Sequence, residues 1–301
     1  MTEKVKALLR ILLETSIGQV KPGQHAFPVI WEEPHSPVVR SVVEIAQANY
    51  FPSLSEKQKV YFECSLPRFK FVLDRVLKYL PLESRILDVG CAPGYLSIFL
   101  DTLGYRVNGI DLNESWFDEY PDPKWLRFLN VQAANVEQSP LPFSDKLFDG
   151  IIFTEVLEHI AVCPPGKILG DFRRVLKPGG YLFLSTPNVA NASNILALAT
   201  GNNIFWRPEI FYGSTDRHNR EYTPDEVVTL LMSEGFRICE SFLFNGPNNW
   251  NTATAALMYE SLNAINHTDC PLLGNTIFAV CQPSLAAEGK ADDRATQMTR
   301  S

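Results

Sequence analysis

From about residue 84 onward, the hydrophobic positions fall into short apolar runs that alternate with helical stretches. The apolar runs include RILDV, YRVNGID, FDGIIFT and YLFLST, and the stretches between them include YLSIFLDTLG and a helix that ends in RRVLKPGG. Repetition of strand, helix and strand predicts a parallel sheet with crossover helices, and continuous apolar strands fit a sheet that is covered on both faces. We therefore expect a doubly wound α/β fold.

The first 80 residues are predicted to form an N-terminal helical segment. Helices are expected over residues 2–16 and about 66–80, separated by chain that contains proline and is rich in aromatic residues. In the second helix, apolar side chains recur at spacings of three and four and form one stripe. The stripe comprises Phe69, Val72, Leu73, Val76, Leu77 and Leu80. Such a stripe predicts that the helix packs against another element.

The main domain is expected over residues 81–284, with insertions at 187–222 and 246–275. These insertions are long for connections inside a compact domain, so we expect them to form cap elements that contribute to acceptor recognition. Between them, Thr223, Pro224 and Glu226 predict a helix start with a capping box, and strands are expected in ICESFLF and TIFAVCQ. Residues 285–301 are expected to be a flexible polar tail.

The charge balance narrows the choice of partner and compartment. Lys and Arg number 27 against 34 Asp and Glu, which gives a formal net charge of −7. Because gripping nucleic-acid phosphates requires a basic surface, no DNA partner is expected. Charged residues interrupt the first apolar stretch, so we expect no signal peptide, no membrane span and a cytoplasmic location. The oligomeric state stays open.

Residues 88–94, DVGCAPG, form the clearest candidate binding feature, at a predicted junction of strand and helix. Gly90 and Gly94 let the backbone turn tightly and let a ligand approach main-chain atoms. The spacing differs from the GxGxxG of dinucleotide sites, and the acid Asp88 suits a ligand with a cationic amino-acid part better than a pyrophosphate. Asp111 ends the next strand, where a carboxylate can accept both hydroxyls of a ribose. A nucleotide-like ligand is predicted here.

The same turn is followed, in order, by NVEQSPLPFSDKLFDGIIFTEVLEHI and LKPGGYLFLSTPN. With these segments, residues 84–186 resemble the class I S-adenosylmethionine-dependent methyltransferases, and the region is also similar to O-methyltransferases of the ubiquinone pathway. The resemblance implies a Rossmann-like sheet of seven strands, the last of them antiparallel, and S-adenosylmethionine as the cofactor.

The resemblance also implies a set of cofactor contacts. Asp88 and Gly90 would border the methionine moiety, Asp111 would hold the ribose, and Leu112 would flank the adenine. The full set is Asp88, Gly90, Ala92, Gly94, Asp111, Leu112, Asn135, Val136 and Thr154. Two positions depart from many members of the family: Ala92 stands where glycine is common, and Asn135 where aspartate is common. The amide oxygen of Asn135 can still accept a hydrogen bond from the adenine amine.

His159 and His218 are the candidate catalytic residues. His159 ends EVLEH at the carboxyl edge of the sheet, where open α/β sheets bind their ligands, and it could take a proton from an acceptor hydroxyl. Small-RNA 3′-terminal ribose methyltransferases have a similar ExxEH stretch and a later histidine that bind a metal together. By that resemblance, Glu155, Glu158, His159 and His218 would form a divalent-metal site. We prefer the reading without a metal, in which His159 is a base or a hydrogen-bonded structural residue.

The sequence therefore predicts an S-adenosylmethionine-dependent methyltransferase that acts on a small molecule, most readily at oxygen. Two alternatives stay open. An RNA-terminal ribose methyltransferase would need a local basic patch, for which the candidates are Arg173, Arg174, Arg207, Arg217 and Arg220. A catalytically silent methyltransferase-like binding protein would need a damaged cofactor site, which the intact turn argues against.

Overall fold

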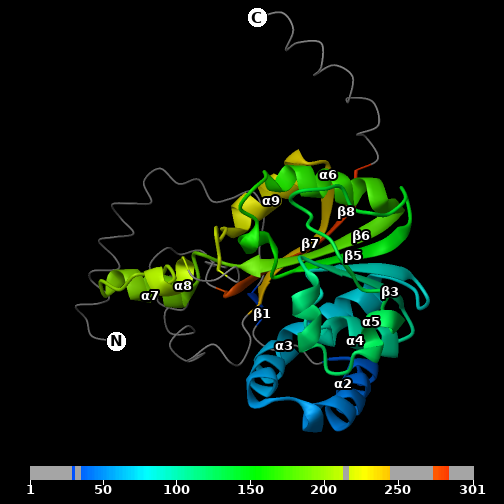
Figure 1. The fold of residues 1–301 in the computed structure, drawn as a ribbon. Coiled ribbons are helices and arrows are strands. Elements are labelled where there is room, and N and C mark those ends of the chain that lie inside the picture. Colours follow the sequence, from blue (N-terminus) through cyan, green and yellow to red (C-terminus); the bar gives the residue numbers. More distant parts are fainter. Residues whose placement is uncertain (1–28, 31–34, 213–216, 245–273, 285–301) are drawn as a thin grey trace, which may run out of the picture.

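The computed structural model describes residues 29–30, 35–212, 217–244 and 274–284, and it is built around one mixed sheet (Figure 1). The strands are β1 Val29–Ile30, β2 Arg85–Val89, β3 Arg106–Asp111, β4 Gln132–Ala133, β5 Phe148–Thr154, β6 Leu176–Pro187, β7 Phe236–Phe244 and β8 Thr276–Pro283. Their order is β1-β7-β8-β6-β5-β2-β3-β4. Only β8, of these strands, runs antiparallel to its neighbours. The predicted fold with an antiparallel last strand is confirmed, and the two-residue β1 extends the seven strands at one edge.

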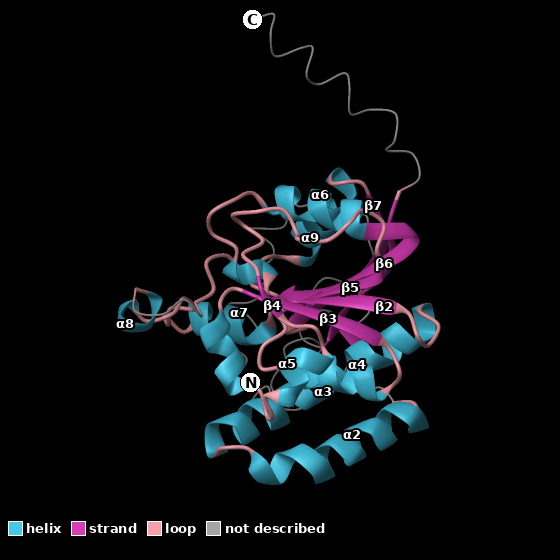
Figure 2. Ribbon diagram, turned by 45° about the vertical axis from the view of Figure 1, so that its right-hand side comes forward, coloured by secondary structure: helices cyan, strands magenta, loops and turns pink. Residues whose placement is uncertain are grey.

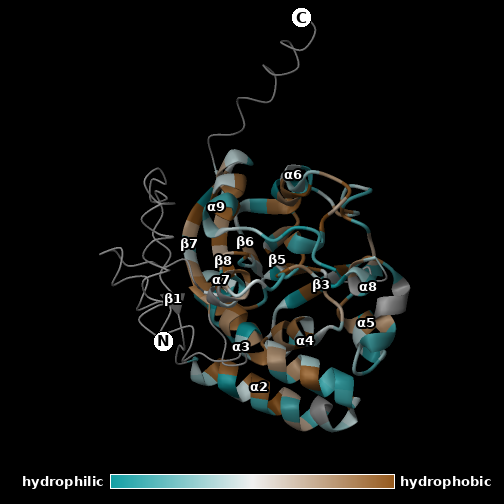
Figure 3. Cartoon of the chain, turned by 90° about the vertical axis from the view of Figure 1, so that its left-hand side faces the viewer, coloured by the Kyte–Doolittle hydropathy of each residue, from teal (hydrophilic) through white to brown (hydrophobic). Residues whose placement is uncertain are grey.

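Helices cover both faces of the sheet (Figure 1). On one face lie α2 Pro37–Tyr50, α3 Glu56–Tyr79, α4 Tyr95–Thr102 and α5 Lys124–Phe128, and on the other lie α6 Pro165–Val175 and α9 Pro224–Ser233. Neighbouring strand residues point to opposite faces, so Ile152 and Phe183 belong to the first core while Ile151 and Leu182 belong to the second. Hydrophobic residues accordingly run along strands such as β7 (Figure 3).

The N-terminal part contains more helix than the sequence predicted. The helix expected over residues 66–80 is the second half of α3, which already begins at Glu56 behind a capping box formed by Ser55 and Gln58. The segment expected to be irregular also contains α2, which packs on α3 and α4. Prolines explain why α2 and the first half of α3 were not predicted, because proline usually breaks helices. Pro37 stands at the start of α2, where its missing N–H costs nothing, and Pro67 lies inside α3. The helix expected over residues 2–16 lies outside the described residues.

The first insertion is partly helical. Helices α7 Ala192–Ala199 and α8 Pro208–Phe211 lie to one side of the sheet in both ribbon views (Figures 1 and 2). The predicted capping box is confirmed, because Thr223 Oγ1 accepts the Glu226 N–H while a Glu226 oxygen accepts the Thr223 N–H at 2.9 Å. The predicted strands ICESFLF and TIFAVCQ are confirmed as β7 and β8. Most of the second insertion and the predicted tail fall outside the described ranges.

The sheet register brings the candidate site together. Asp88 pairs with Gly109 and Ile152, Asp111 pairs with Ala133, and Thr154 pairs with Ser185. The carboxyl ends of β2, β3, β4 and β5 therefore meet at one edge. Within the described ranges, no helix combines the length and the hydrophobicity needed to cross a bilayer.

Candidate active site

The glycine turn between β2 and α4 adopts a backbone that only glycine enters without strain. Gly90 has φ of +74° and Gly94 has φ of +87°. A Cβ on Gly90 would come within 2.4 Å of Val156 Cγ2, and one on Gly94 would come within 2.1 Å of the Tyr120 ring. The turn is thus closely packed against the loop after β5 and against Tyr120, and its open side faces a cavity.

Asp111 fixes the same turn from the end of β3. One carboxylate oxygen accepts the Ala92 N–H at 2.9 Å, and the other accepts the Leu112 N–H at 2.7 Å. Asp111 is only 7% exposed, and its burial raises the pKa of the carboxyl, although the two N–H donors act in the opposite direction. Each carboxylate oxygen has a second lone pair, so Asp111 can still accept hydrogen bonds from a ligand.

Asp88 is a second buried acid at this edge. Its carboxylate accepts the Ser97 hydroxyl from α4 at 2.5 Å. The pKa of Asp88 is raised to about 7. Burial is the largest cause, the Ser97 hydrogen bond acts in the opposite direction, and nearby Asp111 also raises the pKa. Asp88 therefore joins β2 to α4 beneath the turn.

A cavity of about 890 Å³ connects the glycine turn with the carboxyl ends of the strands. The predicted site residues on its wall are Asp88, Gly90, Ala92, Gly94, Asp111, Leu112, Val136, Thr154, Glu155, Glu158, His159 and His218. One predicted contact, Asn135, does not line it: the Asn135 amide oxygen folds back and accepts the Glu137 N–H at 2.9 Å, and Glu137 lines the cavity instead. Glu137 was not among the predicted site residues, because its carboxylate contacts residues 161–163, which are distant in the chain.

Two buried donors on the cavity wall have no hydrogen-bond partner among the described residues. They are Arg68 Nε, from α3, and the Tyr95 hydroxyl, from α4. Buried polar groups are normally satisfied, so these two atoms, in residues that line the cavity, are exceptions. Sequence reasoning missed both. For Arg68, the available signal was its spacing along α3. Arg68 lies four residues before Val72 and Arg75 three residues after it, so both arginines share the face of Val72.

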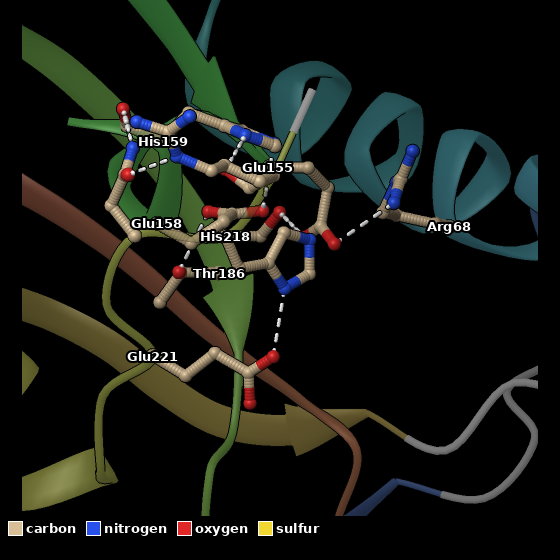
Figure 4. Close-up of polar contacts among 10 residues, drawn as sticks. Arg68, Glu155, Glu158, His159, Thr186, His218 and Glu221 are labelled. Carbon is tan, nitrogen blue, oxygen red and sulfur yellow. Dashed lines mark hydrogen bonds and ion pairs between the residues drawn. The ribbon is translucent and has the colours of Figure 1, made fainter. Parts of the chain in front are cut away.

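The carboxylates and the histidine of the loop after β5 also line this cavity, and Figure 4 shows them together with His218. Ligand atoms of Glu158, His159 and His218 lie within 4.8 Å of one another. Glu155, the fourth residue of the proposed metal set, does not join them. It pairs with Arg68 Nη1 at 3.0 Å and accepts the Ser185 hydroxyl at 2.6 Å. The structure therefore brings together three of the four predicted ligands.

Hydrogen bonds orient each member of this group. His159 Nδ1 lies 2.9 Å from the Arg217 carbonyl oxygen, and because a carbonyl can only accept, Nδ1 carries a proton. A neutral His159 then has its lone pair on Nε2, which lies 3.9 Å from Glu158. Glu158 is 1% exposed and accepts the Thr186 hydroxyl at 2.9 Å. Burial, with a contribution from Glu155, holds the pKa of the Glu158 carboxyl well above its usual range.

His218 stands on a segment that docks on this loop. Its Nδ1 lies 2.7 Å from Glu221, and its ring is 5.5 Å, centroid to centroid, from the ring of Trp206, which also lines the cavity. The next residue, Asn219, donates its side-chain amide to the His159 carbonyl at 2.7 Å. The first insertion thereby contributes an aromatic ring and an imidazole to the wall of the cavity.

Comparison with known proteins agrees with this geometry. A family model described as a methyltransferase domain matches residues 67–241. A ubiquinone biosynthesis O-methyltransferase of Roseobacter denitrificans is 30% identical over 170 residues, which cover 56% of this chain and 66% of that protein. The mitochondrial ubiquinone biosynthesis O-methyltransferase of Homo sapiens is 28% identical over 184 residues, covering 57% of this chain and 48% of that protein. The chain thus matches about half to two thirds of the length of these relatives.

Solved structures share the fold. A SAM-dependent methyltransferase from Archaeoglobus fulgidus aligns with a TM-score of 0.50 at 18% identity, covering 74% of this chain and 97% of that one. The PH0226 protein from Pyrococcus horikoshii aligns with a TM-score of 0.51 at 19% identity, covering 80% and 99%. The chain belongs to the methyltransferase-domain family, as a class I S-adenosylmethionine-dependent methyltransferase.

Proposed function

We propose that this protein transfers a methyl group from S-adenosylmethionine to an oxygen of a small-molecule acceptor. The observation that carries the proposal is one cavity whose wall includes the glycine turn, Asp111, His159 and His218. A methyl donor held at the turn would share this cavity with both imidazoles. The O-methyltransferase names of the relatives support oxygen as the acceptor atom.

The residues present fit this cofactor. Gly90 and Gly94 line the cavity, and Asp111 retains lone pairs for the ribose hydroxyls. Leu112 and Val136 offer apolar surface for adenine at the same edge. Arg68 and Tyr95 line the cavity, and their side chains are our candidates to bind the carboxylate of the amino-acid moiety. When bound, the cofactor supplies a methyl group on a positively charged sulfur.

His159 is our candidate base. With Nδ1 donating to the Arg217 carbonyl, a neutral His159 has its lone pair on Nε2, which can take the proton of an acceptor hydroxyl. The oxygen then gains a bond to the methyl carbon as that carbon leaves sulfur, and the proton ends on Nε2. The Glu158 carboxyl lies 3.9 Å from the same nitrogen.

A divalent metal is the second candidate for this role, because Glu158, His159 and His218 have mutual spacings that fit one ion. Two imidazoles and one carboxylate suit transition metals such as zinc or iron and leave positions open for an acceptor oxygen. A bound ion would lower the pKa of that hydroxyl, which a base would otherwise have to deprotonate unaided. We keep the metal-free base as the preferred reading, since the Glu155 side chain is held by Arg68 and Ser185.

A small acceptor is also preferred over RNA. Among the arginines proposed as a basic patch, Arg174 pairs with Asp145 and Asp171, and Arg220 pairs with Glu226. Arg217 donates to Asn219 and to the Phe211 carbonyl. Carboxylates thus neutralise two of the five arginines, and the net charge of −7 opposes the approach of a phosphate backbone.

The test is transfer of labelled methyl from S-adenosylmethionine to a panel of acceptors. The panel holds phenols and catechols, matched anilines, and a short RNA with a free 3′-terminal ribose. We expect label only on phenolic oxygens, and much less of it with Asp111→Ala when S-adenosylmethionine is not saturating. Label on the RNA would favour the ribose reading. Binding of the cofactor without transfer to any acceptor in the panel would favour the silent binding protein.

A further inference from the structure

Glu137 makes an unusual set of contacts next to the proposed active site. One oxygen of its carboxylate accepts the N–H of Ala161 at 2.8 Å, the N–H of Cys163 at 3.3 Å and the N–H of Val162. These three consecutive backbone donors belong to the loop that directly follows His159. Charge-assisted bonds from a carboxylate to several N–H groups are among the stronger polar contacts in a protein.

Glu137 itself is fixed to the cofactor end of the cavity. It stands in the turn after β4, where the Ala134 N–H donates to the Asp111 carbonyl at 2.7 Å and the Glu137 N–H donates to the Asn135 side chain at 2.9 Å. Ala134, Val136 and Glu137 all line the cavity. Glu137 is therefore part of the wall on which we place the adenine.

The loop on the other side carries His159 and is also held by hydrogen bonds to residues 217–220. The Asn219 amide donates to the His159 carbonyl, and the His159 N–H donates to the Val156 carbonyl at 3.0 Å. Glu137 supplies the contacts immediately beyond His159, and Ile160, between the two, lines the cavity. A displacement of the Glu137 turn would thus be transmitted to His159 through a single intervening residue.

We propose that Glu137 is a positioning residue that couples occupancy of the adenine pocket to the placement of His159. The proposal rests on the proposed function of that pocket and of His159. Binding of the nucleoside immobilises the turn that carries Glu137, and the three backbone bonds pass that restraint to the loop. The restraint thereby reaches His159, which lies on the wall of the same cavity.

The test follows the His159 ring by NMR in protein with ¹³C-labelled histidine, while S-adenosylhomocysteine is added. The chain has five histidines, so the His159 signal is assigned by its loss in His159→Gln. In the wild type we expect S-adenosylhomocysteine to shift the His159 signal. Glu137→Ala should abolish that shift while changing the affinity for S-adenosylhomocysteine by less than about tenfold, the scale of one ordinary hydrogen bond.

Two further variants distinguish the length of the Glu137 side chain from its charge. Glu137→Asp keeps the charge but shortens the side chain, so it should lose the response as Glu137→Ala does. Glu137→Gln keeps an acceptor oxygen at the right distance and should retain the response. Gln138→Ala, at the exposed neighbouring position, is the matched control and should behave as wild type.

Turnover with an acceptor from the panel gives the second readout. We expect Glu137→Ala to lower kcat by about 10- to 100-fold, as misplacement of a catalytic group does, and to add little to His159→Ala in the double variant. A wild-type response to S-adenosylhomocysteine in Glu137→Ala, no response in the wild type, or multiplying losses in the double variant would overturn the proposal. Failure of the proposed function would show differently: S-adenosylhomocysteine would not bind at all, or His159→Ala would keep full turnover.

Discussion

The rings of His159 and His218 are in edge-to-face contact, with centroids 5.1 Å apart and planes inclined at 81°. They come from different parts of the chain, one from the loop after β5 and the other from the segment before α9. The contact is built by backbone pairing, since the N–H groups of Asn219 and Arg220 both donate to the Glu158 carbonyl. The two imidazoles are thus placed together by the fold, and the cavity reaches both.

The first prediction concerns this pair. If His159 is a base, His159→Ala should lower kcat by about 10²- to 10⁴-fold, because proton removal from the acceptor loses its partner. His218→Ala should cost less, and a chelator should leave the wild type active. His35→Gln is the control, since His35 pairs with Asp74 away from the cavity.

A metal predicts a different pattern in the same assay. Chelation would abolish turnover, a divalent ion would restore it, and His218→Ala would be as damaging as His159→Ala. Metal analysis of the dialysed protein is the direct check. Activity that survives both chelation and His159→Ala would rule out both chemical roles and leave alignment of the reactants as the whole of catalysis.

Asp88 should make stability depend on pH. Burial raises its pKa from 3.8 in the unfolded chain to about 7 in the folded protein. The folded state therefore keeps a proton that the unfolded state loses, so the contribution of Asp88 is fully present below pH 4 and is lost as the pH rises through 7. At about 1.4 kcal/mol per pH unit, the loss is at most about 4 kcal/mol.

Urea unfolding of wild type and Asp88→Asn, without cofactor, measures this contribution. The asparagine keeps an acceptor for Ser97 but does not titrate. The stability of the wild type relative to Asp88→Asn should fall between pH 4.5 and pH 7.5. An unchanged difference across that range would mean that Asp88 is ionised in the folded protein throughout.

Gly94 and Gly104 offer a matched pair for the glycine turn. Both have positive φ, +87° and +97°, but a Cβ on Gly94 would strike the Tyr120 ring, whereas one on Gly104 would meet nothing within 4 Å. Gly104→Ala should cost about 1–2 kcal/mol, the cost of a left-handed backbone alone. Gly94→Ala should cost about 1–3 kcal/mol more, because it adds a steric clash. Equal losses in urea unfolding would contradict the close packing of Tyr120 on the turn.

Arg68 should recognise the amino-acid end of the cofactor. Arg68→Gln should weaken S-adenosylhomocysteine by about 1.5–3 kcal/mol, the usual scale for a hydrogen bond to a charged group. Methylthioadenosine has the same nucleoside but no carboxylate, so its affinity should not change. A loss that is equal for both ligands in calorimetry would assign Arg68 to the support of Glu155 rather than to ligand binding.

Much of the fold could be predicted because its signals are local. The apolar runs located β2, β3, β5 and β6, and the capping box at Thr223 located the start of α9. The helix α2 was missed because its proline and its short polar interruptions resemble a loop when neighbours in space are unknown. What stabilises α2 is the core that it shares with α3 and α4, which no window of sequence contains.

The candidate site likewise contains residues that a local motif predicted and residues that only the tertiary structure brings to the cavity. The turn at Gly90 and Asp111 is encoded in one continuous motif, and its geometry followed from residue types. Arg68 and Glu137 reach the cavity through tertiary packing, so neither had a sequence signal of comparable strength. The engagement of Glu155 by Arg68, which removes it from the histidine group, likewise depends on where α3 packs.

The central claim is that S-adenosylmethionine binds between the glycine turn and Asp111, and calorimetric titration with S-adenosylhomocysteine tests it most directly. The wild type should bind one equivalent. Asp111→Ala should still fold and should bind more weakly by about 1.5–3 kcal/mol, because the ribose hydroxyls lose a charged acceptor. Unchanged affinity in a folded Asp111→Ala protein, or a wild type that ignores S-adenosylhomocysteine and binds NAD tightly, would contradict the account.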